Sequence, residues 1–162
     1  MDAVREISLV ATVLTTGLMA GIYLAFSLAV MPGLRASDDD TFVRTMRAMN
    51  RAIVNPVFFL VFLGPLLLGM IAVLSRLPDG DGLEQAAVGL LLYVATLVIT
   101  AAVSVPLNNA LDEAPGDALS AEVRARFEQR WVRWNLVRTA LAAAAFLAHV
   151  LAVMAYSFVP LS

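Results

Sequence analysis

The sequence contains no cysteine, and this absence excludes disulfide bonds, thiolate metal sites and cysteine nucleophiles. It has one histidine, His149, which is a poor basis for a metal or haem site, so we expect no bound metal. There is no glycine-rich phosphate loop, dinucleotide fingerprint, metalloprotease motif or serine-hydrolase elbow. The net charge of -2 is small and scattered along the chain, which argues against a nucleic-acid partner.

Charged residues are also scarce, at 15% of the chain against 60% hydrophobic residues, and the mean hydropathy is +0.83. Four stretches carry no charge at all, namely residues 7–34, 52–75, 85–111 and 139–162. Each exceeds the roughly 20 apolar residues that a helix needs to span a bilayer. We therefore predict an all-α fold, a single integral membrane four-helix bundle over residues 1–162. Its helices are expected at about residues 7–30, 54–75, 85–106 and 135–158.

The distribution of arginine indicates the orientation of these helices. Most arginines lie between the first and second helices or between the third and fourth, whereas Arg5 and Arg76 lie on the other side. The positive-inside rule then places both longer connections in the cytoplasm and both termini outside. The lipid bilayer of the cytoplasmic membrane is therefore an expected partner.

The first connection carries a short amphipathic helix at about residues 40–53. Ser37 to Asp40 form an N-cap cluster whose negative charge suits the helix dipole. Apolar residues then recur at helical spacing, with arginines on the other side. These apolar residues are Phe42, Met46, Met49 and Ile53. We expect this helix to lie at the membrane surface.

Prolines mark several expected helix boundaries. Met31-Pro32-Gly33 is expected to end the first helix, and Asn55-Pro56 to begin the second with Asn55 as its cap. Pro106 is expected to stop or bend the third helix, because proline removes a backbone donor and its ring crowds the preceding turn. Ser120 can cap a helix that continues into the fourth membrane segment.

Polar residues form a stripe along the first helix and another along the third. They are Thr12, Thr16, Tyr23 and Ser27 on the first helix, and Tyr93, Thr96, Thr100, Ser104 and Asn108 on the third. Two interpretations are open: an internal polar seam between helices, or hydroxyl groups that bond back to their own helix. Tyr23 is harder to explain by the second, because its hydroxyl needs a partner within hydrocarbon.

The strongest candidate site is the stretch that leads into the last hydrophobic segment. Four of its residues lie at i, i+3, i+4 and i+7 and share one helical face, namely Trp131, Trp134, Asn135 and Arg138. The predicted topology brings to this face Asn108 and Asn109 from the third helix, and Asn50 and Arg47 from the amphipathic helix. We therefore predict a polar pocket at this border of the membrane.

The alternative is an ordinary membrane interface, with tryptophans as anchors and arginines that reach lipid headgroups. It explains Trp131 well, but it explains Asn108, Asn135 and Arg138 poorly, because amides are costly where the apolar zone begins. His149 follows Arg138 by close to three turns, so both occupy one face roughly 16 Å apart at about 1.5 Å per residue. His149 is therefore a further candidate ligand contact, or else a structural histidine.

Three blocks of the sequence resemble those of the anthrone oxygenase-like family of small membrane proteins. The blocks are residues 50–56 (NRAIVNP), 105–108 (VPLN) and 130–139 (RWVRWNLVRT), joined by Gly21, Tyr23, Phe26 and Ser27 in the first helix. The resemblance implies an oxygenase that oxidises anthrones to anthraquinones with dioxygen and no bound cofactor. It implies that Trp134 stacks on a flat, lipophilic small molecule, while Asn108, Asn135 and Arg138 stabilise the oxyanion. The general base stays unassigned.

A rival hypothesis is a non-catalytic membrane protein whose pocket binds a quinone-like lipid or which serves as a partner subunit. A small transporter is a third hypothesis, and the lack of acidic residues within the helices argues against proton coupling. Gly17 and Gly21 form a small-xxx-small pair that allows close approach of a neighbouring backbone. The oligomeric state is left open, and a homo-oligomer is possible.

Overall fold

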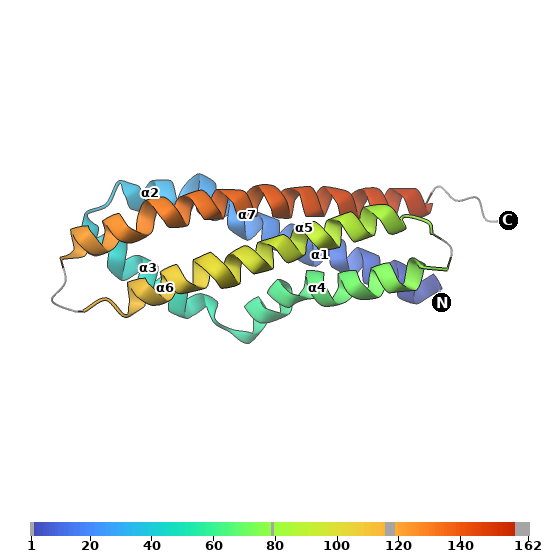
Figure 1. Cartoon of the computed structure of the whole chain (residues 1–162), viewed down its shortest axis with the longest axis horizontal. Coiled ribbons are helices and arrows are strands. Elements are labelled where there is room, and N and C mark those ends of the chain that lie inside the picture. The colour runs from blue at the N-terminus through green and yellow to red at the C-terminus, as the bar shows by residue number, and fades with distance from the viewer. Residues whose placement is uncertain (1, 79, 116–118, 158–162) are drawn as a thin grey trace.

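The structure is a computed structural model that describes residues 2–78, 80–115 and 119–157, and every regular element within these ranges is a helix (Figure 1). In chain order the elements are α1 (Asp2–Ala25), η1 (Phe26–Val30), α2 (Met31–Arg35), α3 (Asp39–Ile53), α4 (Pro56–Arg76), α5 (Leu83–Ile99), η2 (Thr100–Ser104), α6 (Val105–Asp112) and α7 (Ser120–Ser157). The two segments η1 and η2 are π-helical.

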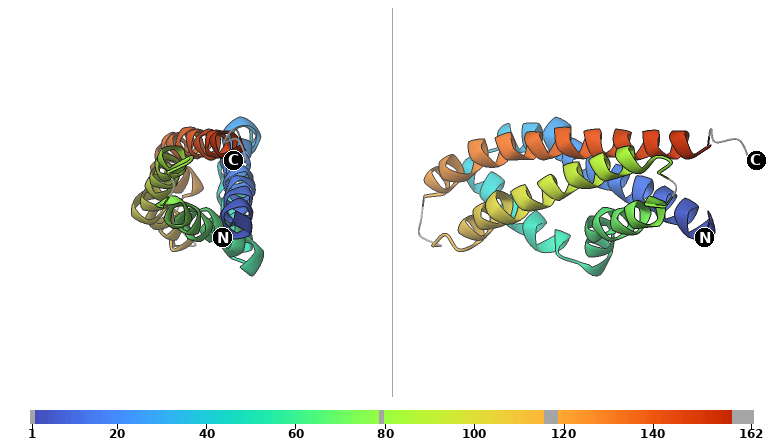
Figure 2. Two further views of the ribbon diagram at one scale, coloured as in Figure 1. Left: turned by 90° about the vertical axis from the view of Figure 1, so that its right-hand side faces the viewer. Right: turned by 45° about the vertical axis from the view of Figure 1, so that its right-hand side comes forward.

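Four continuous helical runs are long and apolar enough to cross a membrane. They are Ala3–Arg35, Pro56–Arg76, Leu83–Asp112 and Ser120–Ala155. The predicted all-α fold with four membrane spans is confirmed. The helices α1 and α5 each pack against both α4 and α7, so α4 and α7 occupy opposite corners of the bundle (Figure 2). The N-terminus lies at one end, and α2, α3, α6 and the start of α7 lie at the other, which we call the α3 end (Figure 1).

The distribution of side chains is that of a membrane protein. Large apolar residues such as Leu28, Leu60 and Leu91 lie exposed on the outside of the bundle. Thr12 and Thr96 are buried between the helices, and their hydroxyl groups donate to backbone carbonyls of their own helices. The two interpretations of the polar stripes are therefore compatible, because these threonines face the interior and also bond back to their helix.

The expected end of the first helix at Met31-Pro32-Gly33 is wrong, because the helix continues through α2 to Arg35. A π-helical turn lies directly before the proline. In it the backbone N–H of Met31 donates to the carbonyl of Phe26, five residues earlier. This wider turn accommodates the proline ring, which would crowd a carbonyl in a regular α-helix.

The third span repeats this solution, since Pro106 does not stop the helix, which runs on to Asp112. The π-helical segment η2 directly precedes Val105-Pro106, and the N–H of Val105 donates to the carbonyl of Thr100. Each π-helical segment lies just before the part of its span that reaches the α3 end, namely α2 or α6. The helix therefore continues beyond its proline and forms further turns at that end.

The helix α7 is continuous from Ser120, so the membrane segment expected at residues 135–158 is the second part of a longer helix. Loss of charge marks where a helix enters an apolar zone, and the helix itself begins earlier. The described part of α7 ends at Ser157, and residue 158 lies outside the described residues.

The amphipathic helix α3 begins at Asp39, close to the predicted position, and Asp38 is its N-cap. The backbone N–H and the hydroxyl of Thr41 both donate to the Asp38 carboxylate, and these hydrogen bonds lower the pKa of Asp38. At the other end of α3, Asn55 caps α4 as predicted, because its side chain accepts a hydrogen bond from the N–H of Phe58.

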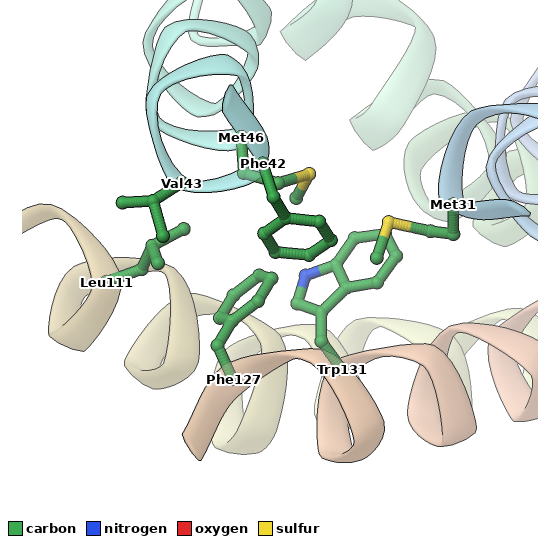
Figure 3. Packing of buried hydrophobic residues seen from close by; sticks show 7 residues of the cluster. All are labelled: Met31, Phe42, Val43, Met46, Leu111, Phe127 and Trp131. Atoms are coloured by element: carbon green, nitrogen blue, oxygen red, sulfur yellow. The ribbon is translucent and has the colours of Figure 1, made fainter. Parts of the chain in front are cut away.

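The apolar face of α3 packs on protein. Its buried side chains contact α2, α6 and α7 in a core cluster at the α3 end (Figure 3). The cluster consists of Met31, Phe42, Val43, Met46, Leu111, Phe127 and Trp131. Arg124 of α7 fixes the same end, since its guanidinium lies 4.5 Å from the ring centre of Phe42 and donates to Asp39 and Glu128. The helix α3 is thus part of the bundle.

Candidate functional site

A cavity of about 560 Å³ lies between the four spans and α3, close to the α3 end. This volume falls within the range of about 300–1,000 Å³ that is usual for small-molecule sites. Its wall is mainly aromatic and aliphatic. The lining residues are Ile22, Tyr23, Phe26, Met49, Asn50, Arg51, Ile53, Val54, Phe58, Phe59, Phe62, Thr100, Ser104, Val105, Asn108, Asn109, Asp112, Trp131, Asn135 and Arg138.

Arg138 is the buried cation of this cavity, with 5% of its surface exposed. Its Nη1 donates to the hydroxyl of Thr100 at 3.2 Å, and its Nη2 donates to Oδ1 of Asn135 at 2.9 Å. The guanidinium carbon lies 4.6 Å from the ring centre of Tyr23 and 5.6 Å from that of Trp131. Within the described ranges no carboxylate forms an ion pair with Arg138. The cavity therefore holds a positive charge that the protein surrounds with dipoles and π faces.

Asn135 joins this guanidinium to the first span. Its Nδ2 donates to the backbone carbonyl of Tyr23 at 3.0 Å and to the hydroxyl of Ser27 at 2.9 Å. Thr139, one turn later on α7, lies within hydrogen-bond distance of the Ser27 hydroxyl, at 3.1 Å. Ser27 belongs to the π-helical η1, so this polar contact fixes the position of the widened turn beside the cavity.

Asn108 and Trp131 form a second pair on the cavity wall. The indole N–H of Trp131 donates to Oδ1 of Asn108 at 2.9 Å. The indole also contacts Phe26 and Phe127, with ring centres at 5.5 Å and 6.0 Å. Trp131 is thereby held rigidly, and the amide nitrogen of Asn108 can still donate to an acceptor in the cavity.

Three buried polar atoms on this wall have no hydrogen-bond partner among the described residues. They are Nε of Arg138, the hydroxyl of Tyr23 and Nδ2 of Asn50. Buried polar groups are almost always hydrogen-bonded, because leaving one unpaired costs about 1–3 kcal/mol. All three atoms are able to donate, so a bound molecule with acceptor oxygens would satisfy them.

The structure brings together seven of the ten predicted site residues. These are Tyr23, Asn50, Asn108, Asn109, Trp131, Asn135 and Arg138. Their roles in binding or catalysis stay predictions, since no ligand is present. The remaining three predicted residues do not line the cavity.

Trp134 is 36% exposed and lies beside Arg130 and Arg133, at the edge of the α7 face that lines the cavity. It directly precedes Asn135, and a step of one residue turns the helix by about 100°, so the indole lies at the edge of the inward face. The stacking role expected for Trp134 therefore has no support from its position.

Arg47 and His149 have contacts outside the cavity, and the buried Nε2 of His149 has no hydrogen-bond partner among the described residues. The guanidinium of Arg47 donates to the carbonyls of Leu111 and Ala114 at the end of α6, at 2.9 Å and 3.0 Å. His149 is fully buried near the other end of the bundle, where its Nδ1 lies 3.3 Å from the hydroxyl of Thr16. A Cβ atom at Gly89 would overlap the His149 ring, so this glycine provides the space for it.

Sequence reasoning missed the aromatic wall on α4 and the carboxylate on α6. Phe58 and Phe62 stack with ring centres 5.3 Å apart and form the side of the cavity that belongs to α4. Asp112 lines the cavity one turn after Asn108. The spacing of four residues from Asn108 to Asp112 and from Phe58 to Phe62 was visible in the sequence, but only the tertiary structure shows which faces enclose a space.

The mouth of the cavity lies between the start of α4 and the η2–α6 segment. Its exposed apolar residues include Val54, Phe59 and Val105. Its charged residues are Arg51 and Asp112, whose side chains approach to 3.7 Å. Both π-helical segments also contribute lining residues, which is consistent with the frequent occurrence of π-helical turns at functional sites.

Residues 46–148 match the family model described as anthrone oxygenase. This chain belongs to the anthrone oxygenase family. The match runs from the second half of α3 through most of α7 and thus includes most residues of the cavity wall. Neither the curated proteins nor the solved structures give a match.

Membership confirms the resemblance drawn from residues 50–56, 105–108 and 130–139, all of which lie within the matched region. In the folded chain these three blocks contribute to one cavity. Among the described residues, no group of three or more histidine, cysteine, aspartate or glutamate side chains is placed to hold a metal ion.

Proposed function

We propose that the protein is a membrane-embedded oxygenase that converts an anthrone-like, lipophilic polycyclic phenol to the corresponding quinone with dioxygen and without a bound cofactor. The observation that carries this proposal is the cavity around Arg138. The cavity has a buried guanidinium that forms no ion pair with a described carboxylate, and a Tyr23 hydroxyl that has no hydrogen-bond partner among the described residues. Its wall is largely aromatic, and its volume suits a flat ligand. Family membership agrees with this reaction class.

The reaction needs little from the protein beyond control of charge and position. An anthrone loses a proton from its CH₂ carbon to give an electron-rich anion whose negative charge rests largely on the carbonyl oxygen. This anion reduces dioxygen, and the overall reaction converts anthrone and O₂ to anthraquinone and water. A site that binds the oxyanion more tightly than the neutral ketone accelerates the first step.

The cavity supplies donors for such an oxyanion. Nε of Arg138 and the hydroxyl of Tyr23 are both buried, unpaired and on the cavity wall. Asn135 holds the guanidinium through its hydrogen bond to Nη2, so the donor is positioned before a ligand arrives. A fixed donor of this kind is worth more than a mobile one, because it needs no reorganisation during the reaction.

The flat ligand would lie between opposite corners of the bundle. Phe58 and Phe62 belong to α4, whereas Trp131 belongs to α7, and these two helices lie diagonally opposite each other in the bundle. The exposed apolar mouth residues Val54 and Phe59 would admit a lipophilic molecule from the bilayer. The asymmetry of arginine supports a cytoplasmic location for this end of the bundle, and a reporter fused to the C-terminus should then be found outside.

The test is turnover by the purified protein in lipid nanodiscs, with chelator present and anthrone as substrate. We expect oxygen uptake and anthraquinone formation in equal amounts above the rate of empty nanodiscs. Arg138→Gln should lower the rate by about 10²–10³-fold, the usual effect of removing one oxyanion donor. Arg133→Gln is the matched control, because Arg133 lies on the outer face of the same helix.

Binding of anthraquinone is measured by the quenching of tryptophan fluorescence, and a variant that binds anthraquinone is folded. A wild-type protein that binds the quinone and leaves anthrone at the background rate would overturn the oxygenase proposal in favour of a quinone-binding protein. Equal rates for wild type and a folded Arg138→Gln variant would remove Arg138 from the site.

A further inference from the structure

Among the described residues that line the cavity, the charged ones are Arg51, Asp112 and Arg138. Asp112 is therefore the one carboxylate in the described part of the wall, and no step of the oxyanion scheme uses it. Its side chain is 39% exposed, which places it at the mouth, whereas Arg138 is buried. The cavity therefore has a buried cation, Arg138, inside it, and its opening carries the carboxylate of Asp112 beside the guanidinium of Arg51.

The separate positions of Arg138 and Asp112 match the positions of the two reactive groups on an anthrone. The carbonyl carbon and the acidic CH₂ carbon occupy opposite positions of the central ring. A ligand whose carbonyl oxygen points to Arg138 must therefore direct its CH₂ carbon away from the guanidinium. The group that accepts the proton has to come from another part of the wall, and a carboxylate is a suitable acceptor.

The position of Asp112 on α6 supports this assignment. Asp112 follows Asn108 by four residues, so both lie on the same face of α6, and both line the cavity. Asn108 is fixed by its hydrogen bond from Trp131. Arg51 of α3 approaches the Asp112 carboxylate at 3.7 Å, a distance too long for a tight bidentate pair, so carboxylate oxygen remains available to another partner.

The other titratable side chains that sequence reasoning considered are less well placed. His149 does not line the cavity and is packed against Gly89 near the other end of the bundle. Tyr23 lies beneath the guanidinium of Arg138, on the side of the wall that would face the oxyanion. Neither is positioned to take a proton from the opposite side of the ring.

We propose that Asp112 is the general base of this site and removes the proton from the CH₂ carbon of the anthrone-like substrate, an inference that rests on the proposed function. In this step the C–H bond breaks, and its electron pair enters the ring system to give the anion that faces Arg138. An O–H bond forms on the Asp112 carboxylate. The exposed position of Asp112 lets the proton leave to water at the mouth, while dioxygen remains the oxidant of the later steps.

Proton exchange without oxygen tests this step separately from oxidation. Anthrone is incubated anaerobically in D₂O with the protein in nanodiscs, and deuterium at the CH₂ carbon is followed by mass spectrometry. The wild type should exchange well above empty nanodiscs, and Asp112→Asn should slow protein-dependent exchange by at least about 100-fold, the lower range for loss of a general base. Asp112→Glu should retain part of the rate.

The neighbouring Glu113→Gln is the matched control, because Glu113 is exposed and does not line the cavity. It should exchange at the wild-type rate. Anthraquinone has no proton to lose, so its affinity should change by no more than about twofold in Asp112→Asn, which shows that the variant is folded and binds. Full exchange by a folded Asp112→Asn variant would overturn the proposal, as would loss of exchange in Tyr23→Phe with Asp112→Asn unaffected.

The two proposals fail in different ways. Exchange that depends on Asp112, together with no anthraquinone formation in air, would keep the base and reject the oxygenase. Anthraquinone formation in air that is unaffected by Asp112→Asn, with equally unaffected exchange under nitrogen, would keep the oxygenase and reject the base. Wild-type protein that binds anthraquinone without accelerating exchange would also reject Asp112 as the base.

Discussion

Two tyrosines lie buried in the same apolar cluster between the spans, and they differ in what their hydroxyl groups contact. The hydroxyl of Tyr93 donates to the backbone carbonyl of Phe62 at 2.6 Å. The hydroxyl of Tyr23 has no partner among the described residues and lies on the cavity wall. Both residues are tyrosines and both are buried. They differ in whether the protein supplies an acceptor for the hydroxyl group.

The two arginines Arg47 and Arg138 show the same contrast. Arg47 donates to two backbone carbonyls at the end of α6, which explains its position by structure alone. Arg138 leaves Nε unpaired beside a cavity. An unpaired buried donor is unfavourable, so the unpaired donors on the cavity wall are groups that a ligand could complete.

The tyrosine pair offers the sharpest test of this comparison. Tyr23→Phe removes a donor of the proposed oxyanion site and should lower turnover by about tenfold, with little change in stability, because the Tyr23 hydroxyl forms no hydrogen bond of ordinary geometry with a described residue. Tyr93→Phe leaves the carbonyl of Phe62 without its partner and should lower stability by about 1–2 kcal/mol with little change in turnover. Turnover assays and unfolding in detergent measure both effects.

The opposite pattern would break the comparison. If Tyr23→Phe destabilised the protein as much as Tyr93→Phe and left turnover intact, the Tyr23 hydroxyl would have a structural role. A double variant provides a check, since its two effects should add if the hydroxyl groups act independently.

Much of this arrangement could be predicted from the sequence, because membrane insertion makes strong demands on composition. The four charge-free stretches gave the spans, and Asn55 next to Pro56 gave the start of α4. An amide or a guanidinium is unfavourable against lipid, and this correctly predicts that the side chains of Asn135 and Arg138 face the interior of the bundle.

The remaining features depend on tertiary contacts. Pro32 and Pro106 were expected to end or bend helices, but a π-helical turn before each proline keeps the helix continuous, and local propensity does not predict that turn. Periodicity gives the direction of a side chain, and it leaves residues at the edge of a face undecided, as Trp134 shows. It also cannot show that His149, on the same face as Arg138, meets a packed interior instead of a cavity.

The packed end of the bundle should be more sensitive to added volume than the cavity end. Gly89→Ala would place a methyl group against the ring of His149, so stability should fall by about 1 kcal/mol even after the gain in helix propensity. Gly21→Ala is the control, because nothing lies within 4 Å of the position of its Cβ atom, and it should leave stability unchanged or raise it. Thermal unfolding of the two variants measures the difference.

Replacing His149 in the Gly89→Ala background sharpens this result. The double variant Gly89→Ala with His149→Ala should show a coupling between the two sites, since the smaller side chain removes the overlap. Additive losses would mean that the ring moves aside in Gly89→Ala and that the glycine is not required for its position.

The smallest expected effect concerns the solvent-exposed cap of α3, at the far side of the core cluster from the cavity. Asp38→Ala removes the acceptor of two hydrogen bonds from Thr41 and should lower the melting temperature slightly, whereas Asp40→Ala, which loses only an exposed ion pair with Arg44, should change it less. The pKa of Asp38 is below its ordinary value of 3.8 in the folded protein, so its contribution to stability is present above that value and is lost as the pH falls through the folded-state pKa. The difference between wild type and Asp38→Ala should therefore be constant from neutral pH down to about pH 5 and disappear in strong acid. A difference that persists in strong acid would show that the cap acts through something other than the ionised carboxylate. Turnover should be unaffected throughout the neutral range, because Asp38 and Thr41 do not line the cavity.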